Sequence, residues 1–254
     1  LEEDGIAVDE VAALLEGGLR PTLAHVIPNF QNPAGYTLSL AKRQRLLELA
    51  REHDFVLFED DPYVDIRFSG EPLPRMLELD GGAASEHVVY ASSFSKTVCP
   101  GIRVGYLVGP PALIKKIQVR ATNTYIAPNM VAQGTVYAYL QGKRFPAALE
   151  RVKSALAERV GLLDDALREH LPQATFRRPE GGYFLWVSLP EGEGHDVARI
   201  TAEAAARGVA IVPGTDFLLE GGHNSFRLAY SAVQPGDVDE GVRRLAAAIE
   251  AARS

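Results

Sequence analysis

The sequence predicts an α/β fold in its first part and a smaller α+β domain in its second part. Between residues 25 and 109, short apolar runs alternate with a stretch of helical character, which is typical of an α/β layer. From Arg144 onward, leucine and valine recur every three or four residues, and this spacing predicts one long amphipathic helix. We therefore predict two domains, residues 1–143 and residues 144–254, with the long helix beginning at their boundary.

Four apolar runs in the first part are predicted to be buried strands: His25–Pro28, Phe55–Phe58, Val88–Tyr90 and Val104–Gly109. After the first of them, Ser39 is a suitable N-cap for a helix that extends to about His53. The inner face of this helix is expected to carry Leu46, Leu47 and Ala50. Polar residues follow the strands at their carboxyl ends, where open α/β sheets bind ligands.

The second part continues beyond the long helix with shorter elements. Strands are predicted at residues 183–189, 209–212 and 226–230, and helices at residues 197–207 and 238–252. This mixture is typical of a small α+β domain.

Composition narrows the possible classes of function. Hydrophobic residues make up 46% of the chain and charged residues 23%, as in ordinary globular proteins. The formal net charge of −7 argues against a general nucleic-acid-binding surface. Cys99 is the only cysteine, which excludes an internal disulfide and favours a reducing, cytoplasmic compartment. No apolar run is long enough to span a bilayer, so no membrane partner is expected.

Lys96 lies among small hydroxyl residues in the string SSFSKT, and Arg103 follows seven residues later. A lysine in this setting can form an imine with a phosphate-bearing aldehyde, while the hydroxyls and the guanidinium bind the phosphate. Arginine suits that task because its planar fork donates two hydrogen bonds at once and stays charged. Taken alone, the same string is also compatible with a surface lysine on a turn.

Pyridoxal phosphate needs further groups: a carboxylate at its pyridine nitrogen, donors to its ring hydroxyl and, for amino acids, a cation for the α-carboxylate. Asp60 closes the second apolar run, and Tyr63 follows three residues later. Asn32 lies in a proline-glycine turn, and Arg227 interrupts an apolar strand. Each also has an ordinary interpretation. The segment around Asp60 is compatible with a solvated acidic loop, Asn32 with a simple turn, and Arg227 with a charge on an edge strand.

In order and spacing, these strings resemble the class I and II pyridoxal-phosphate aminotransferases of fold type I. Within that family they look most like the broad-specificity subgroup that includes 2-aminoadipate and kynurenine aminotransferases. The motifs that carry the resemblance are NPAG at Asn32–Gly35, Asp-x-x-Tyr at Asp60–Tyr63, Ser-x-Ser-Lys at Ser93–Lys96, Phe226–Arg227, PEGGYFLW at residues 179–186, and Pro213–Gly214. The resemblance spans nearly all 254 residues and implies part of a three-layer α/β/α sheet domain followed by the small domain.

The resemblance also implies how the cofactor is bound. Asp60 is expected to pair with the pyridine nitrogen, and Tyr63 and Asn32 to bond to the ring hydroxyl. The phosphate is expected to be bound by Ser93, Ser95 and Arg103.

For the reaction, the resemblance implies transfer of an amino group from an L-amino acid to a 2-oxo acid, with 2-oxoglutarate a suitable acceptor. Lys96 is expected to form the imine and to move the α-proton as general acid and base. Arg227 is expected to bind the substrate α-carboxylate, which Asn32 also approaches. The resemblance further implies a homodimer.

The sequence departs from the family pattern on its N-terminal side. Nothing here matches the family's glycine-rich phosphate turn or the aromatic residue that stacks on the pyridine ring. The chain begins with Leu1, and its first residues are typical of the middle of a domain. We therefore expect it to correspond to the C-terminal portion of the enzyme and to be inactive by itself.

A competing interpretation is the effector-binding half of a GntR-type transcription regulator, which shares this fold and carries a winged helix on its N-terminal side. Such domains often lack the asparagine that this chain has at Asn32. A lyase or synthase on the same scaffold is a third possibility that these motifs do not distinguish.

The remaining polar residues have simpler interpretations. We expect a solvated helix face at Lys42, Arg43 and Arg45. The six histidines show no ligand spacing, so no metal site is expected. Trp186 is expected to pack in the core, and Cys99 not to act as a nucleophile.

Overall fold

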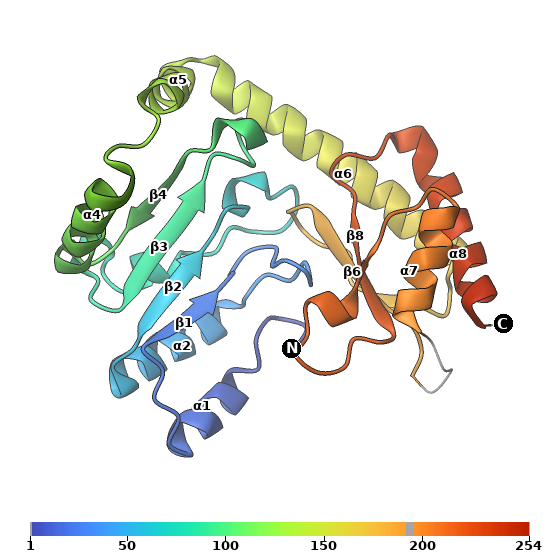
Figure 1. Ribbon diagram of the computed structural model, residues 1–254, viewed down its shortest axis with the longest axis horizontal. Helices are drawn as coiled ribbons and strands as arrows, with labels where there is room; N and C mark the ends of the chain where they lie inside the picture. The colour runs from blue at the N-terminus through green and yellow to red at the C-terminus, as the bar shows by residue number, and fades with distance from the viewer. Residues whose placement is uncertain (1, 192–195, 254) are drawn as a thin grey trace. The chain divides into compact units, whose positions relative to one another are not determined.

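The computed structural model describes residues 2–191 and 196–253. The chain forms two compact units (Figure 1). The first unit comprises Leu1–Asn29 and Tyr36–Arg151, and the second comprises Phe30–Gly35 and Val152–Ser254. The chain thus leaves the first unit for six residues, a feature that the sequence had not indicated.

The first unit contains a four-stranded sheet in the order β1-β2-β3-β4. Strands β1 (Leu23–Val26), β2 (Val56–Asp60) and β3 (Val88–Ser93) are parallel, and β4 (Gly105–Val108) pairs antiparallel to β3. The helices of this unit are α1 (Val8–Glu16), α2 (Leu40–His53), α3 (Met76–Leu79), α4 (Pro111–Tyr125) and α5 (Met130–Gln141). All four predicted strands are present, although β1 ends two residues before Pro28. Their predicted burial is wrong for β4, which stands last in the strand order and is exposed at all four of its residues.

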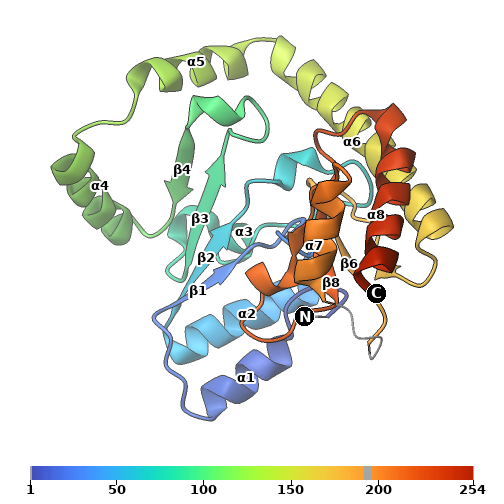
Figure 2. The same cartoon turned by 45° about the vertical axis from the view of Figure 1, so that its right-hand side comes forward.

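Helices α1 and α2 lie side by side (Figure 2) and share one hydrophobic core with the sheet. The Ser39 side chain caps α2 by accepting a hydrogen bond from the Lys42 amide at 3.4 Å. Leu46, Leu47 and Ala50 are buried against the sheet, so the predicted helix and its inner face are confirmed.

The predicted solvated face of α2 is wrong at Arg43, which is fully buried. Its guanidinium donates to the carbonyls of Leu38 at 2.9 Å and Pro28 at 3.2 Å and to Asn29 Oδ1 at 2.8 Å. These loop acceptors are buried, and an arginine with five donors can satisfy several of them at once. Because Arg43 precedes Leu46 and Leu47 by three and four residues, its position on the apolar stripe was readable from the spacing.

The second unit has an antiparallel sheet in the order β5-β6-β8-β7. Its strands are β5 (Thr175–Phe176), β6 (Phe184–Ser188), β7 (Val212–Pro213) and β8 (Ser225–Ala229), and its helices are α7 (Val197–Ala206) and α8 (Val238–Arg253). The predicted long helix is confirmed as α6 (Arg144–His170), which begins in the first unit and continues into the second. No helix among residues 2–191 and 196–253 is both long and apolar enough to cross a membrane.

Strand β7 is shorter than the predicted strand at residues 209–212. The amide of Val209 donates to the Ala204 carbonyl at 2.9 Å, at the end of α7. That amide is therefore used by the helix terminus and is not free to join the β-ladder, so pairing with β8 begins only at Val212.

Candidate active site

The three residues predicted to bind phosphate are connected by hydrogen bonds through Ser95. Ser93 Oγ donates to Ser95 Oγ at 2.9 Å, and the Ser95 amide donates to Ser93 Oγ at 3.1 Å. Arg103 Nη1 donates to Ser95 Oγ at 3.2 Å. The connection between β3 and β4 brings them together, because the Phe94 amide donates to the Val104 carbonyl at 3.0 Å and closes the loop. We call Ser93, Ser95 and Arg103 the hydroxyl cradle.

Lys96 directly follows Ser95 of the hydroxyl cradle, and its Nζ lies 5.5 Å from the centre of the Tyr63 ring. Burial and then the nearby charge of Arg103 lower the pKa of the Lys96 amine. A lowered pKa raises the fraction of neutral amine, which is the form that attacks a carbonyl. Two predicted site residues from different strand ends, Lys96 and Tyr63, are thus brought together.

Asp60 and Asp61 point to opposite faces of the sheet, because side chains alternate along a strand and its extension. Glu59 and Asp61 are fully buried, whereas the Asp60 side chain is about one-third exposed. Asp60 Oδ2 lies 3.1 Å from His25 Nε2, which belongs to the neighbouring strand β1. The Asp60 carboxylate is therefore accessible at a strand end and has an imidazole beside it.

A buried polar network ties the ends of β1 and β2 together, and the sequence motifs gave no sign of it. Asn29 Nδ2 lies 3.0 and 2.9 Å from the two carboxylate oxygens of Asp61, while Arg43 donates to Asn29 Oδ1. Glu59 accepts the amides of Met76 and Leu77, at 2.8 and 2.9 Å, in the first turn of α3. The network fixes the backbone on both sides of Asp60.

Burial raises the pKa of Asp61 from 3.8 to about 7, although the hydrogen bond from Asn29 opposes the shift. In the unfolded chain this carboxyl loses its proton near pH 3.8, whereas the folded protein retains it up to about pH 7. Between these values the folded state binds more protons. The free energy of unfolding therefore falls as the pH rises through this window and levels off above it.

We predict that Asp61→Asn removes this pH dependence and stabilises the protein at pH 8 by up to about 4 kcal/mol relative to wild type. Urea unfolding at pH 4, 6 and 8 measures the effect. Asp65→Asn, at an exposed position, is the control for the change of charge. If wild type and Asp61→Asn show parallel pH profiles, Asp61 does not titrate in this window.

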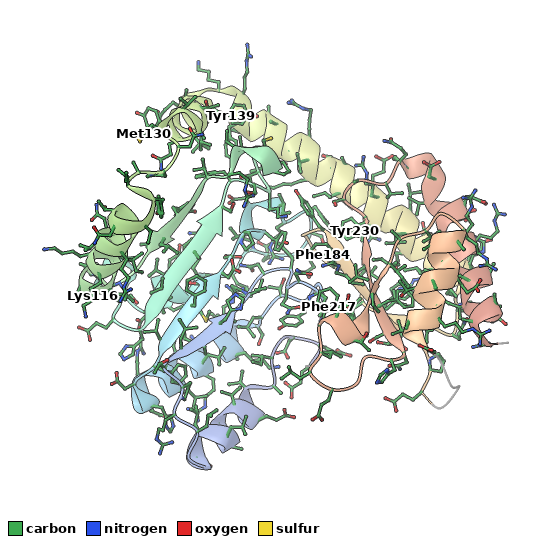
Figure 3. All side chains as sticks on the ribbon, viewed as in Figure 1. Lys116, Met130, Tyr139, Phe184, Phe217 and Tyr230 are labelled. Carbon is green, nitrogen blue, oxygen red and sulfur yellow. The ribbon has the colours of Figure 1, made fainter. Side chains whose placement is uncertain are left out.

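In the second unit, Arg227 and Asn32 are brought together although 195 positions separate them in the chain. Arg227 Nη1 donates to Asn32 Oδ1 at 2.7 Å. The guanidinium carbon lies 4.1 Å from the centre of the Phe184 ring and 5.0 Å from that of Phe217. Figure 3 labels both phenylalanines. Strand β8 pairs on one side with β6 and on the other with β7 at this residue. The alternative that Arg227 is an edge-strand charge is therefore wrong.

Trp186 is half-buried and packs edge-on against Phe217, with ring centres 5.9 Å apart. It therefore supports one of the two aromatic rings beside Arg227. The predicted residues thus form two groups, one in each unit: Asp60, Tyr63, Lys96 and the hydroxyl cradle in the first, and Asn32 with Arg227 in the second.

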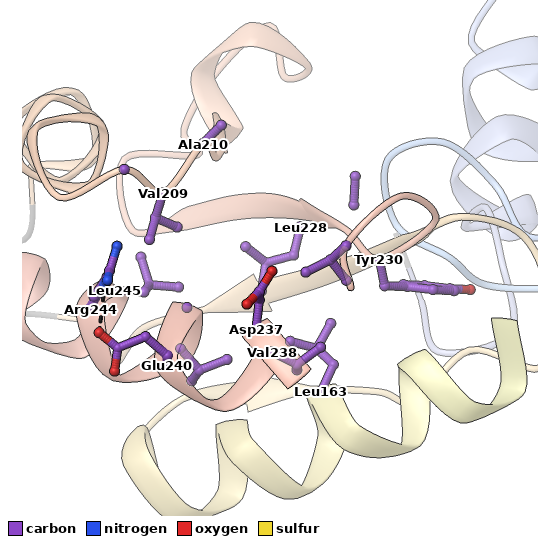
Figure 4. Close-up of a pocket in the computed structure, with 15 residues that line it drawn as sticks. Leu163, Val209, Ala210, Leu228, Tyr230, Asp237, Val238, Glu240, Arg244 and Leu245 are labelled. Atoms are coloured by element: carbon purple, nitrogen blue, oxygen red, sulfur yellow. Dashed lines mark hydrogen bonds and ion pairs between the residues drawn. The ribbon is translucent and has the colours of Figure 1, made fainter. Parts of the chain in front are cut away.

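A cavity of about 520 Å³ lies elsewhere in the second unit, between α8 and β8 (Figure 4). Its wall includes Leu228, which alternation places on the face of β8 opposite to Arg227. Its polar residues include Glu240 and Arg244, which form an ion pair. None of the predicted site residues lines it, so the cavity is separate from the candidate site.

A possible cation-ligand group also lies in the second unit. The side chains of Glu169, His170 and Asp239 place one possible ligand atom each within 4.8 Å of one another. His170 and Asp239 are paired at 2.8 Å, which accounts for their proximity, and exposed acidic groups commonly lie together in this way without an ion. The absence of a metal site stays a prediction.

The fold and the two groups of residues define a class I and II aminotransferase scaffold. Residues 5–245 match the family model described as "Aminotransferase class I and II", and the chain belongs to this family. The sequence-based prediction of the family is confirmed, as is the prediction of an α/β chain of fold type I.

Among similar proteins, the aromatic-amino-acid aminotransferase 1 of Thermococcus litoralis is 33% identical over 98% of this chain and 60% of its own length. The 2-aminoadipate transaminase of Thermus thermophilus is 34% identical, over 98% of this chain and 62% of its own length. The crystal structure of Pyrococcus horikoshii kynurenine aminotransferase, in complex with PMP, has a TM-score of 0.91 and 33% identity, covering 99% of this chain and 62% of that one. The chain thus spans about 60% of the length of these relatives.

Proposed function

We propose that this chain serves in a pyridoxal-phosphate-dependent aminotransferase, which moves the amino group of an L-amino acid to a 2-oxo acid such as 2-oxoglutarate. The observation that carries the proposal is the hydroxyl cradle beside Lys96, with Ser95 directly before the lysine and Arg103 seven residues after it. Two hydroxyls and one guanidinium, linked through Ser95 at 2.9 and 3.2 Å, match the donors that a phosphate dianion requires. The adjacent amine, with its lowered pKa, matches the requirement for an imine with the aldehyde of the cofactor.

Each cofactor-facing residue has a distinct task in this proposal. Pyridoxal phosphate, when bound, supplies an electrophilic aldehyde and an electron-accepting ring. The Asp60 carboxylate, next to His25, holds the proton of the pyridine nitrogen by its negative charge. Tyr63 and Asn32 bond to the ring hydroxyl. Lys96 binds the aldehyde carbon and then carries the proton that leaves the substrate α-carbon.

Arg227 and Asn32 are proposed to bind the α-carboxylate that amino acids and 2-oxo acids share. Two aromatic rings lie against the guanidinium and restrict its rotation. A guanidinium held in one plane can accept a carboxylate through two parallel hydrogen bonds. This explains why a cation stands in an otherwise apolar strand inside the sheet.

The finer features of the function are also proposals. The names of the relatives support aromatic amino acids, 2-aminoadipate and kynurenine as donors to be tried first. The lone cysteine supports a cytoplasmic location, and the family resemblance supports a homodimer. The regulator interpretation would be favoured if the protein, expressed from its complete gene, bound DNA and failed to transfer amino groups.

We predict that Arg227→Ala lowers kcat/KM for amino acids and 2-oxo acids alike by about 100-fold, because a charge-assisted contact is lost from both. Arg227→Lys should also be impaired, since an ammonium group does not reproduce the planar fork. The comparison is between an amino acid and its decarboxylated amine, measured in the protein expressed from its complete gene.

The amine should react poorly with wild type and lose little further activity in Arg227→Ala. Arg199→Ala, at an exposed position on α7, is the matched arginine control. If amine and amino acid lose activity equally in Arg227→Ala, Arg227 maintains the fold and does not recognise the carboxylate.

A further inference from the structure

We propose that Phe30 is a positioning residue for the Asn32–Arg227 pair, and that it acts by anchoring the turn that carries Asn32. The inference rests on the proposed function, because it concerns the binding of the substrate carboxylate. Phe30 lies two residues before Asn32 and is only 1% exposed. It belongs with Asn32 to the six-residue segment that joins the second unit.

The Phe30 side chain occupies the space that two glycines leave open. A Cβ atom added to Gly181 would lie 2.4 Å from Cε2 and Cζ of the Phe30 ring, and one added to Gly182 would lie 2.5 Å from Phe30 Cβ. No side chain tolerates such distances, so the ring and the glycine pair fit each other closely. Gly181 and Gly182 are separated only by Tyr183 from β6 and its aromatic residue Phe184.

The glycine pair is itself fixed to the strand that carries Arg227. Tyr230, just after β8, donates its hydroxyl to the carbonyls of Gly181 and Gly182, both at 2.9 Å. The Tyr230 amide also donates to the Tyr183 carbonyl at 3.1 Å. Because the Phe30 ring packs against the glycine pair, it fixes the turn relative to β8, and so relative to Arg227.

The other end of the turn is also held against β6. A Cβ atom on Gly35 would lie 2.8 Å from the carbonyl oxygen of Phe184, and the Gly35 φ of +73° is in the region that favours glycine. Phe184 contacts the Arg227 guanidinium through its ring. Asn32 thus lies between two close contacts, at Phe30 and Gly35, which together place its Oδ1 at 2.7 Å from Arg227.

The backbone at Phe30 is consistent with this role. Its φ is +50°, which is uncommon for an aromatic residue and is retained only where the surroundings hold it. Releasing the ring should let the turn relax and move Asn32 away from Arg227. Small displacements of a binding group lower affinity strongly.

The test measures 2-oxoglutarate binding by calorimetry and the melting temperature, in cofactor-loaded protein expressed from its complete gene. Phe30→Leu should weaken 2-oxoglutarate binding about tenfold, equivalent to about 1.4 kcal/mol. Gly181→Ala should do the same by displacing the ring, since the Gly181 backbone is outside the left-handed region. The double variant should lose less affinity than the sum of the two single losses, because the smaller leucine leaves room for the new methyl group.

Two controls separate positioning from general destabilisation. Leu167→Ala removes a fully buried side chain of α6 and should lower the melting temperature without changing 2-oxoglutarate affinity. Gly241→Ala adds a methyl group where no atom lies within 4 Å and should change neither. Unchanged affinity in Phe30→Leu and Gly181→Ala, or an equal loss in Leu167→Ala, overturns the role of Phe30. If Arg227→Ala also binds 2-oxoglutarate normally, the proposed carboxylate site fails as well, so the two failures are distinguishable.

Discussion

Replacing Lys96 with alanine is expected to abolish covalent attachment of pyridoxal phosphate and to stop amino-group transfer. In the proposed function, this variant would lose both the amine that binds the aldehyde and the group that moves the α-proton. The proton-transfer role alone contributes about 10²- to 10⁴-fold to the rate. The single-turnover rate with an amino acid, in the protein expressed from its complete gene, measures the combined loss.

Two further variants make the Lys96 result specific. Lys96→Arg keeps the positive charge but provides a guanidinium that does not deprotonate at neutral pH, so it should be as inactive as alanine. Lys116→Ala removes an exposed amine on α4 (Figure 3) and should leave the rate unchanged. Substantial activity in Lys96→Arg would mean that another group moves the proton.

The second large effect is expected at Asp60. Asp60→Ala should lower the half-reaction rate by about 10²- to 10³-fold or more, the usual cost of removing one preorganised electrostatic contact. In the proposed function, the carboxylate at this position would stabilise the protonated pyridine nitrogen while negative charge accumulates on the substrate. The same loss is expected in Asp60→Asn, which preserves the shape of the side chain but not its charge.

The neighbouring Asp61 is the matched comparison for Asp60. Its carboxylate is buried and engaged by Asn29, on the face opposite to Asp60. Asp61→Asn should therefore change stability and its pH dependence while leaving the half-reaction rate within a few fold of wild type. If the single-turnover rate of Asp61→Asn is lower than that of Asp60→Asn, the assignment of Asp60 is wrong.

Helices with clear caps and periodicity were predictable from the sequence, but several non-local features were not. The Ser39 cap and the leucine spacing of α2 and α6 carry their own local signals. The antiparallel direction of β4 has no local signal, because a short apolar run does not show its orientation. The spacing of α2 places Arg43 on the apolar stripe, but the carbonyls of Pro28 and Pro74 that accept its hydrogen bonds lie in other segments and have no local signal.

The same contrast holds for the candidate site. The hydroxyl cradle lies within one stretch of eleven residues, Ser93 to Arg103, so its assembly follows from a single loop. Asn32 and Arg227 are distant in sequence, and only the family resemblance predicted that they belong to one site. The anchor of Phe30 in the glycine pair was missed, although an aromatic residue before NPAG and the two glycines before Phe184 were visible signals.

The most direct test of the account is to identify the lysine that holds pyridoxal phosphate. The protein, expressed from its complete gene and loaded with the cofactor, is reduced with borohydride, digested and analysed by mass spectrometry. The account predicts one pyridoxyl-modified peptide, with the modification on Lys96, and its loss in Lys96→Ala. Modification of a different lysine, or of none, would contradict the central assignment.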